Sequence, residues 1–257
     1  MAVSLKETGL HQIAQQLSER EKISRFLQIV AQAEGCIATT PEAADIYRQA
    51  RAKRDPSTVA FIPTPYPLEA RPWDFSIKPD KQAGIFIGTR EWNVPSRNHF
   101  AALLVARQLC ETTGEAVTVF NLDGRKGRKI LSALDFPAGK LRLIEKRKSY
   151  TDYLHEVAKH KIVLQFDRSR VPGQVAGDAL LCRTICVGGD SAIERIAFPK
   201  TCGAGRTIDE VSAITKELLT STSARGTVFV ESQWRSMERL SFEAIRKQLA
   251  IFFGRLS

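Results

Sequence analysis

The chain has 257 residues, a formal net charge of +10 and a sequence pI near 9.6. Hydrophobic residues make up 43% and charged residues 26%, which is ordinary for a globular protein, argues against a disordered chain and fits one large domain or one domain with part of a second. The excess of Lys and Arg favours an anionic partner, such as phosphate, nucleotide, nucleic acid or a membrane surface, and surface charge without a specific partner is an equal alternative.

Cysteine usage predicts buried thiols and no disulfide framework. The chain has five cysteines, an odd number, and no second pair or histidine tract completes a zinc site. Such thiols are typical of a reducing compartment, so we expect a cytoplasmic protein. The apolar runs are far shorter than the roughly 20 residues of a membrane-spanning helix, and the N-terminal segment lacks the apolar core of an export signal. Peripheral contact with an anionic membrane is compatible with this composition.

The N-terminal part of the chain predicts a partial α/β unit followed by a linker. Apolar residues recur there at helical spacing, short apolar runs indicate strands, and a proline-rich stretch indicates irregular structure. The predicted elements are a helix over residues 10–33, a strand over 35–39, a helix that opens after Thr39 or Thr40 with Pro41 in its first turn, a strand over 59–63 and a linker over 63–82.

From residue 84 onward, short apolar strands alternate regularly with helices. Strands that are apolar along their whole length are typical of a parallel sheet with helices on both faces, so the pattern predicts an α/β, Rossmann-like, doubly wound fold. The expected strands cover residues 84–88, 116–122, 141–145, 161–166 and 184–189. The expected helices cover residues 95–110, 125–133, 150–160, 174–183, 191–197 and 208–219, and a long amphipathic helix covers 232–253.

The loop after the first of these strands carries two arginines. Arg90 directly follows the strand that ends near Gly88 and Thr89, and Arg97 opens the next helix. Guanidinium groups match phosphate oxygens with two hydrogen bonds, and a helix N-terminus adds backbone N–H donors. The loop is therefore a candidate phosphate site, with surface ion pairs, for example to Glu91, as the alternative.

The loop after residues 161–166 repeats this arrangement. In an open parallel sheet this position lies at the carboxyl end of a strand, where ligands bind, and arginines there favour an anionic ligand. Asp178, inside the following helix, could accept hydrogen bonds from sugar or ribose hydroxyls, with a solvated helix residue as the alternative. The candidate residues of the loop itself are Asp167, Arg168, Arg170, Gly173 and Gln174.

Other polar segments carry weaker signals. Asp123 and Gly124 form a turn before a basic cluster over residues 125–129, which we interpret as a solvated helix face in preference to a ligand site. His99 lies near Arg97, and a partly buried helix residue is the favoured interpretation. The chain contains neither a GxGxxG dinucleotide fingerprint nor a P-loop, and we expect no metal site.

The order of these elements over residues 84–219 resembles the C-terminal half of GT-B glycosyltransferases of the group 1 or glycogen-synthase-like superfamily. In that family this half is a Rossmann-like domain that binds a nucleotide-diphosphate sugar. The resemblance implies that Arg90 and Arg97 contact the donor diphosphate and have the catalytic role, with Arg97 in place of the family's lysine. It also implies donor contacts from Gly88, Thr89, Asp123, Gly124, Glu145 and Lys146.

The resemblance further assigns roles around Asp178. Members of the family carry two glutamates with seven residues between them, and Asp178 matches the second, which holds the ribose. The first falls at Arg170, so Asp167 is the expected substitute for the usual acidic contact to the sugar. Arg170, Gly173 and Gln174 would surround the diphosphate or the sugar.

Taken over the whole chain, the resemblance implies a retaining, metal-independent glycosyltransferase without a cofactor, whose unknown acceptor is a glycan, a lipid or a protein. It implies a partial N-terminal unit and linker (1–75), a donor domain (76–225) and a C-terminal helix that crosses back to the N-terminal unit (226–257). The alternative is a non-catalytic Rossmann-like nucleotide- or sugar-binding module or partner subunit. Charge alone supports a nucleic-acid-binding protein, and nucleic acid is not an expected partner.

Overall fold

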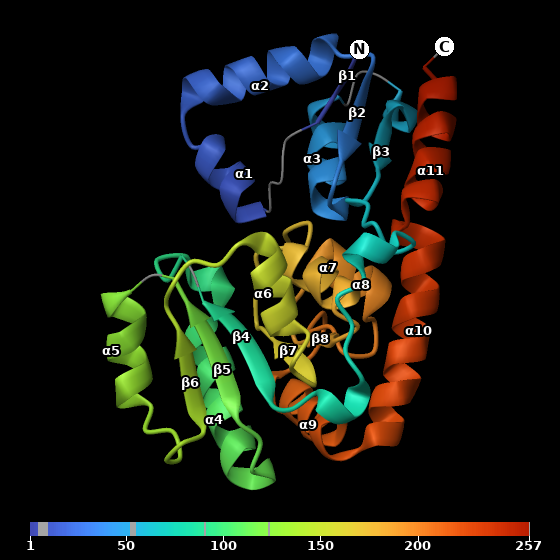
Figure 1. Ribbon diagram of the computed structural model, residues 1–257. Helices are drawn as coiled ribbons and strands as arrows, with labels where there is room; N and C mark the ends of the chain where they lie inside the picture. Colours follow the sequence, from blue (N-terminus) through green and yellow to red (C-terminus); the bar gives the residue numbers. More distant parts are fainter. Residues whose placement is uncertain (5–9, 52–54, 90, 123, 257) are drawn as a thin grey trace.

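The computed structural model describes the chain except for residues 5–9, 52–54, 90, 123 and 257. It contains two parallel β-sheets, of three and five strands, which Figure 1 shows one above the other. The C-terminal helices run along the side of both sheets (Figure 1). The parallel sheets and their helices confirm the α/β fold that the strand-helix alternation predicts.

The smaller sheet has the strand order β1-β2-β3. Thr40 caps α3, because its hydroxyl accepts a hydrogen bond from the Ala43 amide at 3.1 Å. The prediction of one helix over residues 10–33 is wrong: an extended Glu19 precedes a second helix, and the two-residue β1 was not expected. The elements are β1 (Ala2–Val3), α1 (Leu10–Gln16), α2 (Arg20–Gln32), β2 (Gly35–Ala38), α3 (Pro41–Ala50) and β3 (Val59–Phe61).

The larger sheet has the strand order β6-β5-β4-β7-β8, and every pair is parallel. Its strands are β4 (Ile85–Thr89), β5 (Val117–Asn121), β6 (Leu141–Ile144), β7 (Ile162–Leu164) and β8 (Ile185–Val187). Its helices are α4 (His99–Thr113), α5 (Arg125–Ala133), α6 (Tyr150–Val157), α7 (Gln174–Leu181) and α8 (Ala192–Ala197). From β4 the chain adds β5 and then β6 on one side, and it then returns to add β7 and β8 on the other side of β4. Since crossovers between parallel strands share one hand, this reversal puts helices on both faces and a switch point between β4 and β7.

The interior of the larger sheet is apolar on both faces, as its uninterrupted apolar strands predict. Phe86 in β4 and Leu164 in β7 are fully buried. All five cysteines are buried and unpaired. Among the described residues, no helix has the length and apolar character that crossing a membrane requires.

The C-terminal region joins the two sheets. It consists of α9 (Ile208–Thr220), α10 (Thr222–Leu240) and α11 (Phe242–Gly254), so the prediction of one helix over residues 232–253 is wrong. The helix breaks at Ser241, whose hydroxyl caps α11 by accepting from the Ala244 amide at 3.2 Å. Ile245 and Phe252 of α11 form an apolar cluster with Ile62, which directly follows β3. The last helix therefore packs against the smaller sheet, whereas α10 contacts α7, α8 and α9 of the larger unit.

Candidate functional site

A cavity of about 420 Å³ opens at the carboxyl ends of β4, β5 and β7. It lies at the switch point of the larger sheet, where open parallel sheets bind ligands. It is lined by Gly88, Thr89, Arg97, His99, Phe120, Leu122, Arg147, Lys148, Tyr150, Tyr153, Gln165, Asp167, Gln174, Val175 and Asp178.

Two loops that form one wall of this cavity are bonded to each other. The Ser96 hydroxyl lies 2.7 Å from the Ser169 hydroxyl, and the Arg168 amide donates to the Ser96 carbonyl at 2.7 Å. Asn98 adopts a left-handed conformation with φ of 49°, which asparagine tolerates, and its side chain donates to the Phe166 carbonyl at 3.0 Å. The loops after β4 and β7 therefore hold their side chains in a defined relative position.

Arg97 is the most constrained cation of the cavity. Its side chain is 14% exposed and forms ion pairs with Asp167 and with Glu91, the latter at 2.6 Å. Burial alone would lower the pKa of the Arg97 guanidinium, but the two adjacent carboxylates outweigh that effect and raise it. Arg97 is therefore held in the cavity wall by charges that also offset its own.

Asp178 lines the cavity from α7, next to Tyr150 at the start of α6. It is 2% exposed, and the Tyr150 hydroxyl donates to its Oδ1 atom at 2.5 Å. Burial, together with the negative charge of Asp178, raises the pKa of Tyr150 well above its ordinary value, so the hydroxyl keeps its proton and donates. This hydrogen bond involves only one of the two carboxylate oxygens of Asp178, Oδ1.

Aromatic rings form an apolar side of the cavity. The Tyr150 and Tyr153 rings stack at 6.4 Å with an interplanar angle of 18°, and Tyr153 lies 5.4 Å from Phe120. His99 contacts the Trp92 ring edge-on at 5.1 Å. The cavity thus combines a flat apolar surface with carboxylates and cations, which is the composition of a small-molecule site.

Arg147 and Lys148 bring additional positive charge to the cavity. Both are exposed, and neither has an ion-pair partner among the residues that the structure describes. They come directly before α6, in the loop that follows β6. Their charge is therefore less neutralised by protein carboxylates than that of Arg97.

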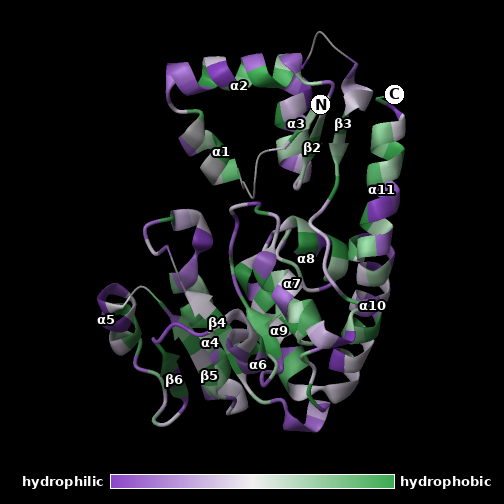
Figure 2. Cartoon of the chain, turned by 45° about the horizontal axis from the view of Figure 1, so that its top comes forward, coloured by the Kyte–Doolittle hydropathy of each residue, from purple (hydrophilic) through white to green (hydrophobic). Residues whose placement is uncertain are grey.

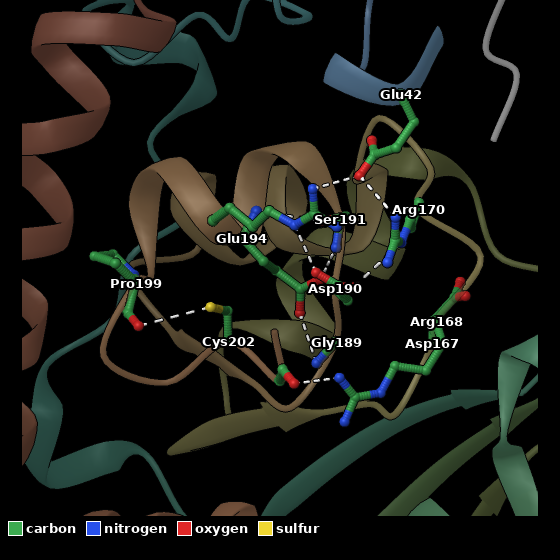
Figure 3. Close-up of polar contacts among 12 residues, drawn as sticks. Glu42, Asp167, Arg168, Arg170, Gly189, Asp190, Ser191, Glu194, Pro199 and Cys202 are labelled. Carbon is green, nitrogen blue, oxygen red and sulfur yellow. Dashed lines mark hydrogen bonds and ion pairs between the residues drawn. The ribbon is translucent and has the colours of Figure 1, made fainter. Parts of the chain in front are cut away.

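Arg170 does not line the cavity but joins the two sheets (Figure 3). Its guanidinium lies 3.6 Å from Glu42 in the first turn of α3 and 3.8 Å from Asp190. Arg195 contacts the same two carboxylates at 2.6 Å and 2.5 Å. The residue that stands where the family carries an acidic sugar contact is thus part of an ion-pair cluster between the units.

Several other predicted residues also face away from the cavity. Arg168 donates to the backbone carbonyls of Gly203 and Arg206, which fixes the loop before α9. Gly173 has a φ of 113°, and a Cβ there would lie 2.4 Å from the Ser191 hydroxyl, so its role is close packing against the start of α8.

The predicted site residues therefore fall into two groups, those that line the cavity and those that do not. The structure brings Gly88, Thr89, Arg97, Asp167, Gln174 and Asp178 together around one cavity. Among the described residues, those predicted for the site but absent from the cavity wall are Gly124, Glu145, Lys146, Arg168, Arg170 and Gly173. Arg90 and Asp123 lie outside the described residues.

Sequence reasoning missed most of the aromatic wall and both exposed cations. A usable signal existed: Phe120 and Leu122 end a predicted strand, and Tyr150 opens the helix after another. Gln165, at the end of β7, carries the same signal. Within the part of the chain that the structure describes, no group of His, Cys, Asp and Glu side chains could hold a metal ion.

No protein-family model matches the chain, and no curated protein matches it. Solved structures are similar: a trehalose-6-phosphate synthase has a TM-score of 0.73 at 11% identity, over 98% of this chain and 68% of its own. A glycosyltransferase from Rickettsia africae has a TM-score of 0.68 at 10% identity, over 100% of this chain and 70% of its own. S. aureus TarM in complex with UDP has a TM-score of 0.67 at 13% identity, over 91% of this chain and 46% of its own.

The chain thus spans about half the length of TarM. At these identities the similarity concerns the arrangement of strands and helices. The fold of the chain is the GT-B glycosyltransferase fold, as the resemblance implied.

Proposed function

We propose that the chain binds a nucleotide-diphosphate sugar in the cavity and takes part in glycosyl transfer to a separate acceptor. The observation that carries this proposal is the cavity at the switch point, where stacked tyrosines, the buried Asp178 carboxylate and three cations surround one space. The GT-B fold supports it, and TarM, which shares the fold, was crystallised with UDP.

In this proposal each side of the cavity meets a different part of the donor. The flat faces of Tyr150 and Tyr153 offer stacking to the base, and Asp178 accepts hydrogen bonds from ribose hydroxyls. Arg97, Arg147 and Lys148 face the diphosphate. Gln174 opens α7, where backbone N–H groups also favour phosphate oxygens.

The proposed reaction breaks the bond between the sugar and the diphosphate and forms a bond from the sugar to an acceptor hydroxyl, whose proton passes to the departing diphosphate. Negative charge grows on the departing diphosphate, so cations fixed beside it stabilise the transition state. Arg97 is prepositioned by Asp167 and Glu91, whereas Arg147 and Lys148 add charge that has no ion-pair partner among the described residues. By resemblance to the family, the reaction would also retain the configuration of the sugar, require no metal ion and use Arg90 at the donor diphosphate.

Calorimetric titration with UDP, GDP and ADP tests the binding part of this proposal. We expect one of the three to bind, and Asp178→Asn to weaken that binding by about 10- to 150-fold, because a hydrogen bond to a charged group contributes about 1.5–3 kcal/mol. Asp209→Asn, in the exposed first turn of α9, is the matched control and should leave affinity unchanged. Absence of binding by all three nucleotides, or equal affinity of both variants, would contradict the proposal.

A non-catalytic nucleotide-binding module is the second candidate. Two observations favour it: Arg97 is already paired with two carboxylates, and Arg170 replaces the acidic sugar contact and is held by Glu42 and Asp190. Release of free nucleotide from UDP-, GDP- and ADP-sugars, with and without simple glycan acceptors, separates the candidates. Tight binding without any release supports the module, and release that Arg97→Ala abolishes supports the transferase.

A further inference from the structure

One edge of the larger sheet carries an unusual concentration of positive charge. Residues 125–152 include nine Lys and Arg against three Asp and Glu. Seven of the cations are exposed at the carboxyl ends of β5 and β6, and we call them the basic edge: Arg125, Lys126, Arg128, Lys129, Lys146, Arg147 and Lys148.

Two segments form the basic edge, and the fold fixes them together. Glu145 accepts from Arg128 of α5 at 3.0 Å and from Asn121 at the end of β5 at 3.2 Å. Asn121 also donates to the carbonyl of Gly124, just before α5, at 3.2 Å. The start of α5, which is hydrophilic in Figure 2, and the loop after β6 are therefore held beside each other.

The charge of the basic edge is not balanced by nearby carboxylates. Arg128 pairs with Glu145, and the other six cations have no ion-pair partner among the described residues. Cations on α11 differ, since Arg246 and Lys247 both pair with Glu243. Most of the net charge of the protein is thus concentrated where it can act as one positive field.

Exposed apolar side chains accompany these cations. Leu122 is 38%, Leu143 37% and Tyr150 42% exposed, and all three lie at the ends of β5 and β6 or at the start of α6. Cations interspersed with aliphatic side chains are typical of surfaces that rest in the headgroup region of a membrane. From this combination we propose that the basic edge binds the surface of an anionic membrane.

Anionic lipid headgroups fit this surface better than nucleic acid does. Single-stranded nucleic acid is held on aromatic platforms along a groove. Among the described residues, the exposed aromatic rings beside the basic edge are Tyr150 and Trp73, which lie 6.1 Å apart. Tyr150 belongs to the cavity wall, where it is bonded to Asp178 and stacked on Tyr153, so these rings form no platform along the basic edge itself. Leu122 and Leu143 offer no such platform. Since Arg147 and Lys148 also line the cavity, the bound orientation places the cavity mouth at the membrane surface.

The test compares binding of the protein to sedimented vesicles. Vesicles of equal parts phosphatidylcholine and phosphatidylglycerol serve as the anionic surface, and pure phosphatidylcholine vesicles as the neutral one. Lys126→Gln with Lys129→Gln removes two cations that do not line the cavity. Lys78→Gln with Lys216→Gln removes two exposed cations elsewhere on the surface, before β4 and in α9, and is the matched control.

We expect binding to the anionic vesicles alone, and its loss at about 1 M salt, where charges are screened beyond about 3 Å. The Lys126/Lys129 variant should partition about thirtyfold less, because each cation near the membrane contributes about 1 kcal/mol, which is roughly fivefold in partitioning per residue. The control variant should bind like the wild type, and melting temperatures should confirm that both variants fold.

Three results would overturn the proposal. The first is a wild-type protein that does not bind anionic vesicles, or binds neutral ones equally well. The second is equal loss of binding in the two double variants, which would indicate net charge without a specific surface. The third is that a single-stranded RNA oligonucleotide binds through Lys126 and Lys129 while the anionic vesicles do not.

Discussion

Two arginine clusters in this protein look alike in sequence but differ in what they connect. Arg97 lies in the loop after β4, and Arg170 lies in the loop after β7. Arg97 pairs with Asp167 and Glu91 and lines the cavity. Arg170 shares Glu42 and Asp190 with Arg195, and this cluster connects the smaller sheet to the larger one (Figure 3). An arginine after a parallel strand therefore marks a ligand wall in one loop and a contact between units in the other.

The two arginines also differ in burial, which decides how much each contributes to stability. The Arg97 side chain is 14% exposed and that of Asp167 is 9% exposed, whereas Arg170 is 48% exposed and its contacts are 3.6 Å or longer. Removing one partner of a buried pair leaves an uncompensated charge, but an exposed pair contributes little. Substitutions in and around the two clusters should therefore lower the free energy of unfolding or the nucleotide affinity by different amounts.

The largest expected effect is that of Arg97→Ala. Because Asp167 would remain buried without its cation, we expect the free energy of unfolding to fall by about 3 kcal/mol in urea denaturation. Arg97→Lys, which keeps the charge, should recover part of this loss. A decrease below about 1 kcal/mol for Arg97→Ala would show that the cavity wall does not depend on this pair.

The next effect concerns the space inside the cavity, and it is tested without changing any charged side chain. A Cβ at Gly88 would meet no atom within 4 Å, so Gly88→Leu should fold normally and place its side chain in the cavity. We expect nucleotide affinity to fall at least about tenfold, or about 1.4 kcal/mol, by calorimetry. Gly226→Leu, at an open position on α10, is the control. Unchanged affinity in Gly88→Leu would place the nucleotide elsewhere.

A smaller effect is expected in the cluster between the units. Arg195 is 27% exposed, and a double-mutant cycle of Arg195→Ala with Glu42→Gln should give a coupling of about 1 kcal/mol. The exposed pair Arg246 and Glu243 on α11 is the control and should couple by about 0.3–0.5 kcal/mol. Coupling no larger than in this control would mean that the contact between units contributes little to stability.

The smallest effect is expected for Arg170→Ala. Its long, exposed ion pairs predict a loss of less than about 1 kcal/mol in unfolding free energy. Because Arg170 does not line the cavity, nucleotide affinity should stay the same. If affinity falls as much in Arg170→Ala as in Arg97→Ala, the distinction between the two clusters is wrong.

Local sequence patterns predicted most elements of the larger unit. The helix expected over residues 125–133 is α5, and all five expected strands are present, because apolar periodicity and short turns act over a few residues. The breaks before α2 and at Ser241 were missed because apolar spacing continues across both. At Ser241 a serine cap and the bridge to Tyr66 outweigh that spacing.

What the sequence by itself determined is that charged loops follow the strands of a parallel sheet. Only the tertiary structure decided which loops share a cavity. Asp167 reaches Arg97 across 70 residues of chain, and Glu42 reaches Arg195 across 153. Such pairings depend on strand order and on the packing of two units, which arise from contacts between distant segments. The local spacing of residues does not indicate these long-range pairings, so the sequence alone could not distinguish the role of Arg97 from that of Arg170.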